Sequence, residues 1–253
     1  MPDPMMATAI HAAREAGRAL VDGMRGEIVV DAKSRRDVKL AMDRAAEKAI
    51  IDTIKATFPD HAILSEEIGR IGGRSDYLWI IDPLDGTYNY SQRLPCWCTS
   101  IALTKGDEEI VGVIYDPLRN ECFSAERGSG AFLNDQPIHV SDTKDLAYAM
   151  VYFGAGHGDR NIPPSFRAAN TLATCAGKIR ALGAAATHMA YVSAGRGEAF
   201  FEFGIKRWDI AAGLVIAREA GAEVSMRPGE DDAIDIVVSN GRFHEALLDA
   251  IHW

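Results

Sequence analysis

The sequence predicts a layered protein whose first half is of the α+β class and whose second half is of the α/β class. Two long helical patterns and a run of alternating strands fill the first half, whereas strands and helices alternate in the second. The 253 residues are 47% hydrophobic and 25% charged, enough for one large domain or two small ones with a substantial core. We expect two subdomains, 1–141 and 142–253, because the pattern changes at that point.

Periodicity gives the order of elements in the first half. Alanine and leucine recur at helical spacing near the N-terminus, and Asp37 can cap the next helix. Pro59 breaks that helix, and turn residues separate the alternating segments that follow, which is typical of an antiparallel meander. The expected elements are helix 5–24, strand 27–30, helix 37–57 and strands 62–64, 77–81, 99–104, 110–115 and 121–126.

The second half alternates in type. Pro163 and Pro164 are tolerated in the first turn of a helix, and Gly221 suits the C-terminal cap of another. The expected elements are strand 148–153, helix 163–175, strand 179–182, helix 184–194, strand 198–203, helix 208–220, strand 234–239 and a last helix to residue 252.

The charge and the apolar pattern exclude several classes of protein. A net charge of −9 argues against a nucleic-acid or anionic-membrane surface. No stretch approaches the ~18 uncharged apolar residues of a membrane span. The N-terminus lacks the features of a secretory signal, so we expect a cytoplasmic protein. The four cysteines match neither zinc nor redox spacing and are expected to be reduced thiols.

Two aspartates follow the apolar run at residues 77–81. Asp82 stands at the carboxyl end of this expected strand, and Asp85 follows three residues later. Pro83 cannot donate to a sheet ladder, so we expect the strand to end there. The two carboxylates should therefore lie together where the strand meets a loop.

The next two residues favour phosphate binding. Gly86 allows a tight turn, and Thr87 can open a helix, so backbone N–H groups converge at one point. Two carboxylates beside such a cradle would repel phosphate unless divalent cations lay between them. Carboxylates, metal and phosphate together indicate magnesium-dependent phosphoryl chemistry.

The segment Asp82–Tyr90 resembles the signature of the inositol monophosphatase family, which are metal-dependent, lithium-sensitive sugar phosphatases. Stretches 65–67, 208–213 and 219–221 match in the family's order and at about its separations. The resemblance spans nearly the whole chain. It implies a sandwich of alternating helix and sheet layers (αβαβα), a homodimer and inhibition by Li⁺.

The resemblance also implies a set of metal ligands. Glu66 and Asp82 with the Leu84 carbonyl would hold one Mg²⁺, and Asp82, Asp85 and Asp209 would hold a second. Mg²⁺ prefers such hard oxygen ligands. Four converging carboxylates carry about −4, so two or three Mg²⁺ are expected per site. Taken singly, the glutamate could be a solvated acid, Asp85 a turn residue and Asp209 a helix cap.

Three residues are implied in catalysis. Thr87 would orient the attacking water, and Asp43 would polarise Thr87. The metal on Glu66 would activate that water for in-line attack on phosphorus, without a covalent phosphoenzyme. Alternatively, Asp43 is an exposed helix acid beside Glu47. Lys33 matches a family lysine near the phosphate or a third metal, or is a solvated loop cation.

Substrate contacts are implied at several positions. Glu202 would bind substrate hydroxyls, whereas Ala184 stands where the family usually has serine or threonine. Lys206, Arg207 and Arg180 could contact a second anionic group or form a solvated basic rim. The implied substrate-binding residues are Asp85, Gly86, Thr87, Gly183, Ala184, Ala185, Glu202 and Asp209.

The expected function is Mg²⁺-dependent hydrolysis of a small phosphate monoester such as inositol-1-phosphate. The partner is then a small phosphate ester, and neither nucleic acid nor membrane is expected. Alternatives within the family are a fructose-1,6-bisphosphatase, a histidinol-phosphatase and a 3′-phosphoadenosine nucleotide phosphatase. A different alternative is a partner of the transcription machinery, since some family members have that role.

Overall fold

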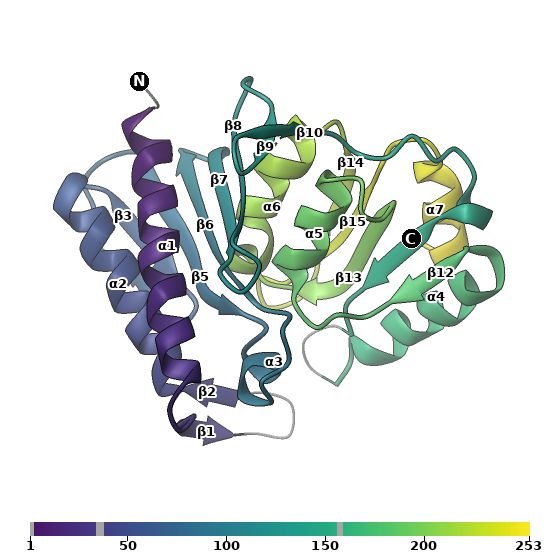
Figure 1. Cartoon of the computed structure of the whole chain (residues 1–253). Coiled ribbons are helices and arrows are strands. Elements are labelled where there is room, and N and C mark those ends of the chain that lie inside the picture. Colours follow the sequence, from purple (N-terminus) through teal and green to yellow (C-terminus); the bar gives the residue numbers. More distant parts are fainter. Residues whose placement is uncertain (1–2, 34–37, 156–158) are drawn as a thin grey trace.

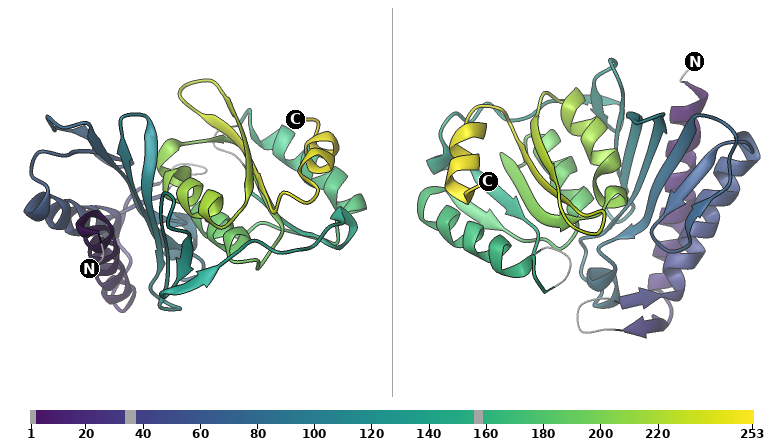
Figure 2. Two further views of the ribbon diagram at one scale, coloured as in Figure 1. Left: turned by 90° about the horizontal axis from the view of Figure 1, so that it is seen from above. Right: turned by 180° about the vertical axis from the view of Figure 1, so that it is seen from behind.

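The elements of the chain stack in five layers (Figures 1 and 2). The computed structural model describes residues 3–33, 38–155 and 159–253. An eight-stranded and a five-stranded sheet alternate with three pairs of helices, which confirms the predicted αβαβα sandwich. The helices, from one outer layer through the middle to the other, are α1 (Pro4–Met24) and α2 (Ala41–Thr57), then α5 (Ala185–Ser193) and α6 (Arg207–Glu219), then α4 (Ile162–Cys175) and α7 (His244–Ile251).

The large sheet contains the predicted meander. Its strand order is β10-β9-β8-β7-β6-β5-β3-β4, and within this sheet, as far as the structure describes it, only β3 and β5 pair in parallel. The strands are β3 (Ala62–Ser65), β4 (Gly69–Ile71), β5 (Tyr77–Asp85), β6 (Cys98–Lys105), β7 (Glu108–Asp116), β8 (Glu121–Glu126), β9 (Ala131–Leu133) and β10 (Gln136–Ile138).

The small sheet has the order β12-β11-β13-β15-β14. Strand β11 pairs in parallel with both neighbours, and β15 pairs antiparallel with both of its own. Strand β14 was not predicted, because its charged and polar residues leave no clear alternation of apolar and polar side chains. The strands are β11 (Met150–Phe153), β12 (Lys178–Arg180), β13 (Ala199–Ile205), β14 (Glu223–Pro228) and β15 (Ile234–Ser239); a short 3₁₀ turn, Leu146–Tyr148, precedes them.

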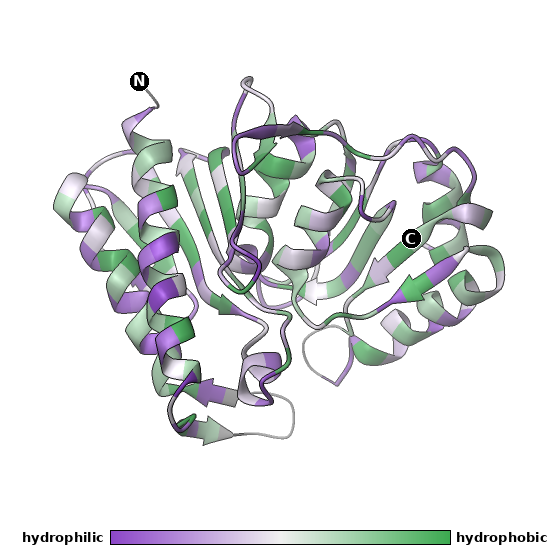
Figure 3. Ribbon diagram, in the orientation of Figure 1, coloured by the Kyte–Doolittle hydropathy of each residue, from purple (hydrophilic) through white to green (hydrophobic). Residues whose placement is uncertain are grey.

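Both faces of the large sheet are covered, so its central strands are buried along most of their length and largely apolar (Figure 3). Trp79 and Ile81 of β5 belong to the core cluster formed with α1 and α2. Ile80, between them, belongs to the cluster formed with α5 and α6. This period of two is that of a strand with alternate side chains on opposite faces. Burial on both sides fixes the position of β5 and of the acids at its end.

Two boundaries near the site differ from the prediction. The strand expected at 27–30 is instead β1 (Val30–Lys33), paired with β2 (Val38–Leu40), and α2 begins at Ala41. The expected cap, Asp37, and the Lys33 side chain lie outside the described residues. Asp43 takes the capping role by accepting the Leu40 N–H at 2.7 Å.

Strand β5 does not end at Pro83. It continues to Asp85 through an irregularity in register opposite β6. Pro83 lacks an N–H, but its carbonyl accepts the Thr99 hydroxyl at 3.0 Å, which holds the irregular segment on the sheet. Helix α3 (Thr87–Ser91) then begins where the sequence predicts. Within the described part of the chain, no helix combines the length and apolarity that crossing a membrane requires.

Candidate metal centre

Three of the four predicted acidic ligands meet in space. Glu66 lies in the turn after β3, Asp82 lies on β5, and Asp209 lies in the first turn of α6. Each side chain offers an oxygen, and the three oxygens all lie within 4.8 Å of one another. Parallel pairing of β3 with β5 brings the first two together, and packing of α6 on the sheet adds the third.

Backbone hydrogen bonds orient two of these acids. Asp82 accepts the Leu84 N–H at 2.9 Å through Oδ1. Asp209 accepts the Lys206 N–H at 2.9 Å through Oδ2 and so caps α6, as the sequence allowed. The helix-cap and metal-ligand interpretations of Asp209 are compatible, because a carboxylate has about four lone-pair positions and one backbone N–H uses only one of them.

Asp85 faces the first turn of α5. Its Oδ1 accepts the Ala185 N–H at 3.1 Å, and its Oδ2 accepts the Ala186 N–H at 2.8 Å. Ala184, at the N-cap of α5, has no side-chain oxygen to make such bonds. Asp85 therefore caps this helix from a strand about 100 positions earlier in the chain.

Burial raises the pKa of all four acids, and mutual repulsion adds to the shift for Glu66, Asp82 and Asp209. Burial, then the Asp209 charge, raises the pKa of Glu66 to about 8. Burial, then the Glu66 charge, raises the pKa of Asp82 well above its usual range. Burial raises the pKa of Asp209 to about 7, with Asp85 next in effect. For Asp85, backbone N–H groups oppose burial, and the pKa rises only to about 6.

This donor set fits Mg²⁺. The oxygens are hard, converge from separate rigid elements and need compensating positive charge to be ionised together. The predicted carbonyl ligand, that of Leu84, already accepts the Thr87 hydroxyl at 2.8 Å. A carbonyl oxygen has two lone pairs, so this bond leaves room for a cation.

The turn carrying Glu66 is held from α2 and β2. Buried Glu47 accepts the Ser65 hydroxyl and, at 3.2 Å, the Ile68 N–H. Lys39 pairs with Glu67 at 2.9 Å. From the sequence, Glu47 was considered only as a neighbour of Asp43, and this role was missed. An acid at a position of α2 that faces the core could have indicated it.

The predicted Thr87–Asp43 pair is not hydrogen-bonded here. The Thr87 hydroxyl donates to the Leu84 carbonyl, and Asp43 caps α2 through the Leu40 N–H. Asp43 is nevertheless buried and close enough for its charge to raise the pKa of Glu66, so the alternative of an exposed helix acid is wrong.

The predicted phosphate cradle has the required backbone. Gly86 adopts φ of +91°, and a Cβ there would lie 2.9 Å from the Cys96 carbonyl oxygen. Any other residue there would have a strained backbone and a steric clash. Among the described residues, the N–H groups of Gly86 and Thr87 donate to no acceptor.

The loop of Gly183 and Ala184 is clamped beside this cradle. Asn89 of α3 donates through Nδ2 to the Cys96 and Leu182 carbonyls, both at 2.7 Å. The Leu182 N–H donates to Nε2 of His188 at 3.0 Å. His188 is buried and burial lowers its pKa to about 3, so it is a neutral structural histidine. The sequence reasoning missed Asn89, because its partners are distant in sequence.

Glu202 is buried on β13 beside Gly154, where a Cβ would lie 1.8 Å from the Glu202 Oε2. Because residue 154 is glycine, the Glu202 carboxylate can occupy this space.

The three basic residues considered for a second anionic group are engaged elsewhere. Lys206 donates through Nζ to the Asp231 carbonyl, and Arg207 pairs with Glu109 at 3.5 Å. Arg180, on strand β12, is exposed and donates to the Ile179 carbonyl. Each of these cations therefore already has an acceptor in this structure.

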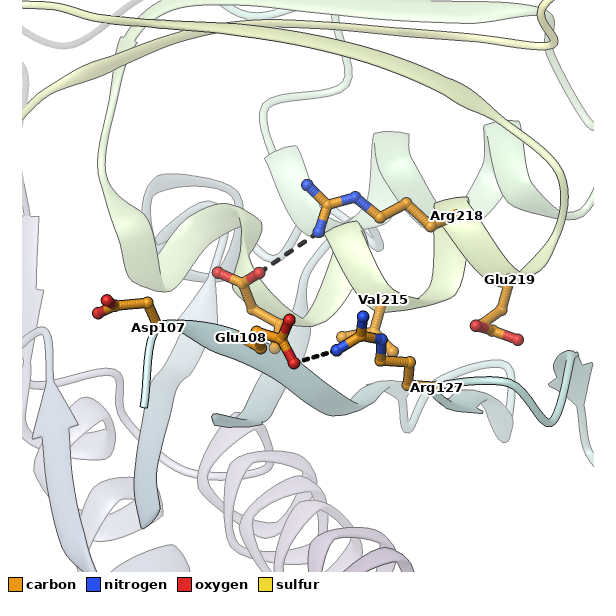
Figure 4. A pocket seen from close by; sticks show the side chains of 7 residues that line it. Asp107, Glu108, Arg127, Val215, Arg218 and Glu219 are labelled. Atoms are coloured by element: carbon orange, nitrogen blue, oxygen red, sulfur yellow. Dashed lines mark hydrogen bonds and ion pairs between the residues drawn. The ribbon is translucent and has the colours of Figure 1, made fainter. Parts of the chain in front are cut away.

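A cavity of about 480 Å³ lies at the other end of α6 (Figure 4). Its arginines are neutralised locally, since Arg127 pairs with Glu108 and Arg218 pairs with Glu109. Glu219, from the third matching stretch, accepts the Gly128 and Gly130 N–H groups at 2.7 and 2.8 Å. That motif therefore holds the turn of Gly128 and Gly130, between β8 and β9, and lies apart from the acid cluster.

Known proteins resemble this chain over most of its length. A sequence model described as the inositol monophosphatase family matches residues 1–252. The protein called Nus factor SuhB in Pasteurella multocida is 43% identical over 226 residues, covering 88% of this chain and 85% of that protein. The protein of the same name in Escherichia coli K12 is 39% identical, covering 97% and 94%.

Solved structures are similar over nearly the whole chain. The extragenic suppressor protein suhB from Bartonella henselae has a TM-score of 0.92 at 34% identity and covers 98% of both chains. The inositol monophosphatase from Anabaena has a TM-score of 0.87 at 35% identity, with 98% of this chain and 95% of that chain covered.

Proposed function

Because the chain belongs to the inositol monophosphatase family, we propose that it hydrolyses small phosphate monoesters with bound Mg²⁺. The observation that carries this proposal is the convergence of Glu66, Asp82 and Asp209 oxygens within 4.8 Å. Their raised pKa values mark a site that needs cations to be fully ionised.

We assign the cation-binding groups to two Mg²⁺ sites that share Asp82. Glu66, Asp82 and the Leu84 carbonyl hold one Mg²⁺, and Asp82, Asp85 and Asp209 hold a second. When bound, Mg²⁺ would lower the pKa of a water molecule and neutralise charge that develops during phosphoryl transfer. The hydrogen bonds from Leu84, Lys206 and α5 fix the carboxylates before any cation arrives.

The cradle binds the phosphate. The Gly86 and Thr87 N–H groups, which have no acceptor among the described residues, would donate to phosphate oxygens. Thr87 is the residue that orients the attacking water. Its hydroxyl donates to the Leu84 carbonyl in this structure and can accept a hydrogen bond from that water at the same time.

The alcohol part of the substrate would lie between Glu202 and the clamped loop of residues 182–184. Buried Glu202 would accept hydrogen bonds from substrate hydroxyls, which favours a polyol or sugar phosphate. Ala184 offers no hydroxyl, so the loop can contribute only backbone groups and methyls.

The test is phosphate release from inositol-1-phosphate, fructose-1,6-bisphosphate, histidinol phosphate and 3′-phosphoadenosine phosphate, with and without Mg²⁺. We expect Mg²⁺-dependent release, fastest for inositol-1-phosphate, because the basic residues near the site are engaged elsewhere. If none of the four esters released phosphate in the presence of Mg²⁺, the assignment would be contradicted.

A second candidate function comes from the relatives called Nus factor SuhB. By that likeness, the chain would also bind a component of the transcription machinery. Asp82→Asn separates the two functions, because it should stop hydrolysis and leave a protein–protein contact intact. Binding of purified transcription components by both wild type and variant would support this second function.

The family likeness also supports a homodimer and inhibition by Li⁺. Light scattering on the purified chain measures the first, and a Li⁺ titration of phosphate release at fixed Mg²⁺ measures the second. A monomer, or release that does not change with Li⁺, would contradict the respective proposal.

A further inference from the structure

A chain of buried polar groups leads from α5 to Asp85. The Thr187 hydroxyl donates to the Cys98 sulfur at 3.4 Å, and the Cys98 thiol donates to Oδ2 of Asp85 at 3.6 Å. A carboxylate only accepts, whereas a thiol both accepts and donates, so the direction of the chain is fixed. Thr187 is 4% exposed, Cys98 0% and Asp85 7%, so water does not compete for these bonds.

The thiol helps to decide which Asp85 oxygen remains open. Oδ2 accepts two donors, the Ala186 N–H and the Cys98 thiol, whereas Oδ1 accepts the Ala185 N–H. Each carboxylate oxygen has about two lone-pair positions. Oδ1 is therefore the oxygen with room for a cation, and the thiol keeps the carboxylate from rotating away from that arrangement.

We infer that Cys98 is a positioning residue for Asp85 and that Thr187 acts through Cys98. This inference rests on the proposed function, since Asp85 matters here only as a ligand of Mg²⁺. Groups that orient a metal ligand typically change metal affinity by about 10- to 100-fold, and a weak thiol donor belongs at the lower end.

The experiment is a calorimetric titration of Mg²⁺ into the metal-free protein at constant pH. We expect Cys98→Ala to weaken binding about 10-fold and Thr187→Val to weaken it less. The double variant should bind as weakly as Cys98→Ala alone, because the Thr187 hydroxyl has no route to Asp85 once the sulfur is gone. Thr187→Ser keeps the hydroxyl and should restore most of the affinity.

The matched control is Cys122→Ala. Cys122 is also a buried thiol on the large sheet, but it lies in the core cluster with α1 and not at the acids. Both cysteine variants should lower thermal stability, and only Cys98→Ala should lower Mg²⁺ affinity. Equal affinity in the two variants and wild type would overturn the positioning role. A wild-type protein that binds no Mg²⁺ would overturn the proposed function as well.

Discussion

The Asp85 carboxylate accepts the Ala186 N–H at 2.8 Å and so joins the end of β5 to the first turn of α5. This bond, with its partner at Ala185, connects the part of the chain that carries three of the acids to the part that carries Asp209. Helix α5 begins with alanines and depends on a distant acid for its cap. The same carboxylate thus caps α5 and is a proposed ligand of Mg²⁺.

The metal-free protein should lose stability as pH rises. Glu66 has a pKa of about 8 in the folded protein, against an ordinary value of 4.5, so the unfolded chain gives up its proton first. The unfolded state binds fewer protons in this window, and the free energy of unfolding falls from about pH 4.5 to about pH 8.

Mg²⁺ should reverse this trend, because it binds the ionised acids. Thermal unfolding with and without Mg²⁺ between about pH 5 and about pH 8 measures the effect. The gain in Tm from Mg²⁺ should be greatest at the upper end. A gain that is greatest near pH 5 is incompatible with the assigned ligands.

Asp82→Asn should stabilise the metal-free protein and abolish the response to Mg²⁺. The substitution removes one charge from a repelling cluster, and the amide oxygen can still accept the Leu84 N–H. We expect a gain of about 1 kcal/mol in the free energy of unfolding near pH 8. Urea unfolding measures it, and exposed Asp107→Asn is the control, with a change within about 0.5 kcal/mol.

Thr87→Val should lower kcat about 100-fold and leave Mg²⁺ affinity nearly unchanged. The hydroxyl is proposed to orient water, whereas the cations are held by carboxylates and a carbonyl. Thr87→Ser retains the hydroxyl and should keep most of the activity. Steady-state kinetics with calorimetry distinguishes the two effects; a valine variant with normal kcat would remove Thr87 from the mechanism.

Asn89→Ala should destabilise the protein by about 2 kcal/mol, because the Cys96 and Leu182 carbonyls lose their donor. The same change should raise KM for substrate, since Asn89 holds the loop of residues 182–184 against the cradle. Gln92→Ala, an exposed change just beyond α3, should alter stability by less than about 0.5 kcal/mol. Equal effects from the two substitutions would show that Asn89 does not clamp the loop.

Local patterns predicted most of the fold. The alternation of Trp79, Ile80 and Ile81 between two core clusters, and the helical spacing of α1, are properties of short segments. Strands β4 and β14 escaped prediction because they lie near sheet edges and carry few buried residues. The start of α2 was misplaced because its cap comes from Asp43, inside the helix, and not from a residue before it.

The acids of the site were found because the family motifs name them. The groups that hold the acids and the neighbouring loop were not found, since Glu47, Asn89 and Cys98 contact partners that only tertiary folding brings near. The family resemblance also implied that Asp43 polarises Thr87, whereas the Thr87 hydroxyl donates to the Leu84 carbonyl, three residues earlier. Local hydrogen bonds of this kind compete with longer-range pairs.

The most direct test is anomalous diffraction from crystals of this protein grown with Mn²⁺ in place of Mg²⁺. The account predicts an anomalous peak between the Glu66, Asp82 and Asp209 carboxylates, at roughly 2.1 Å from their oxygens. Absence of a peak there, in a protein that still releases phosphate when Mn²⁺ is added, would contradict it.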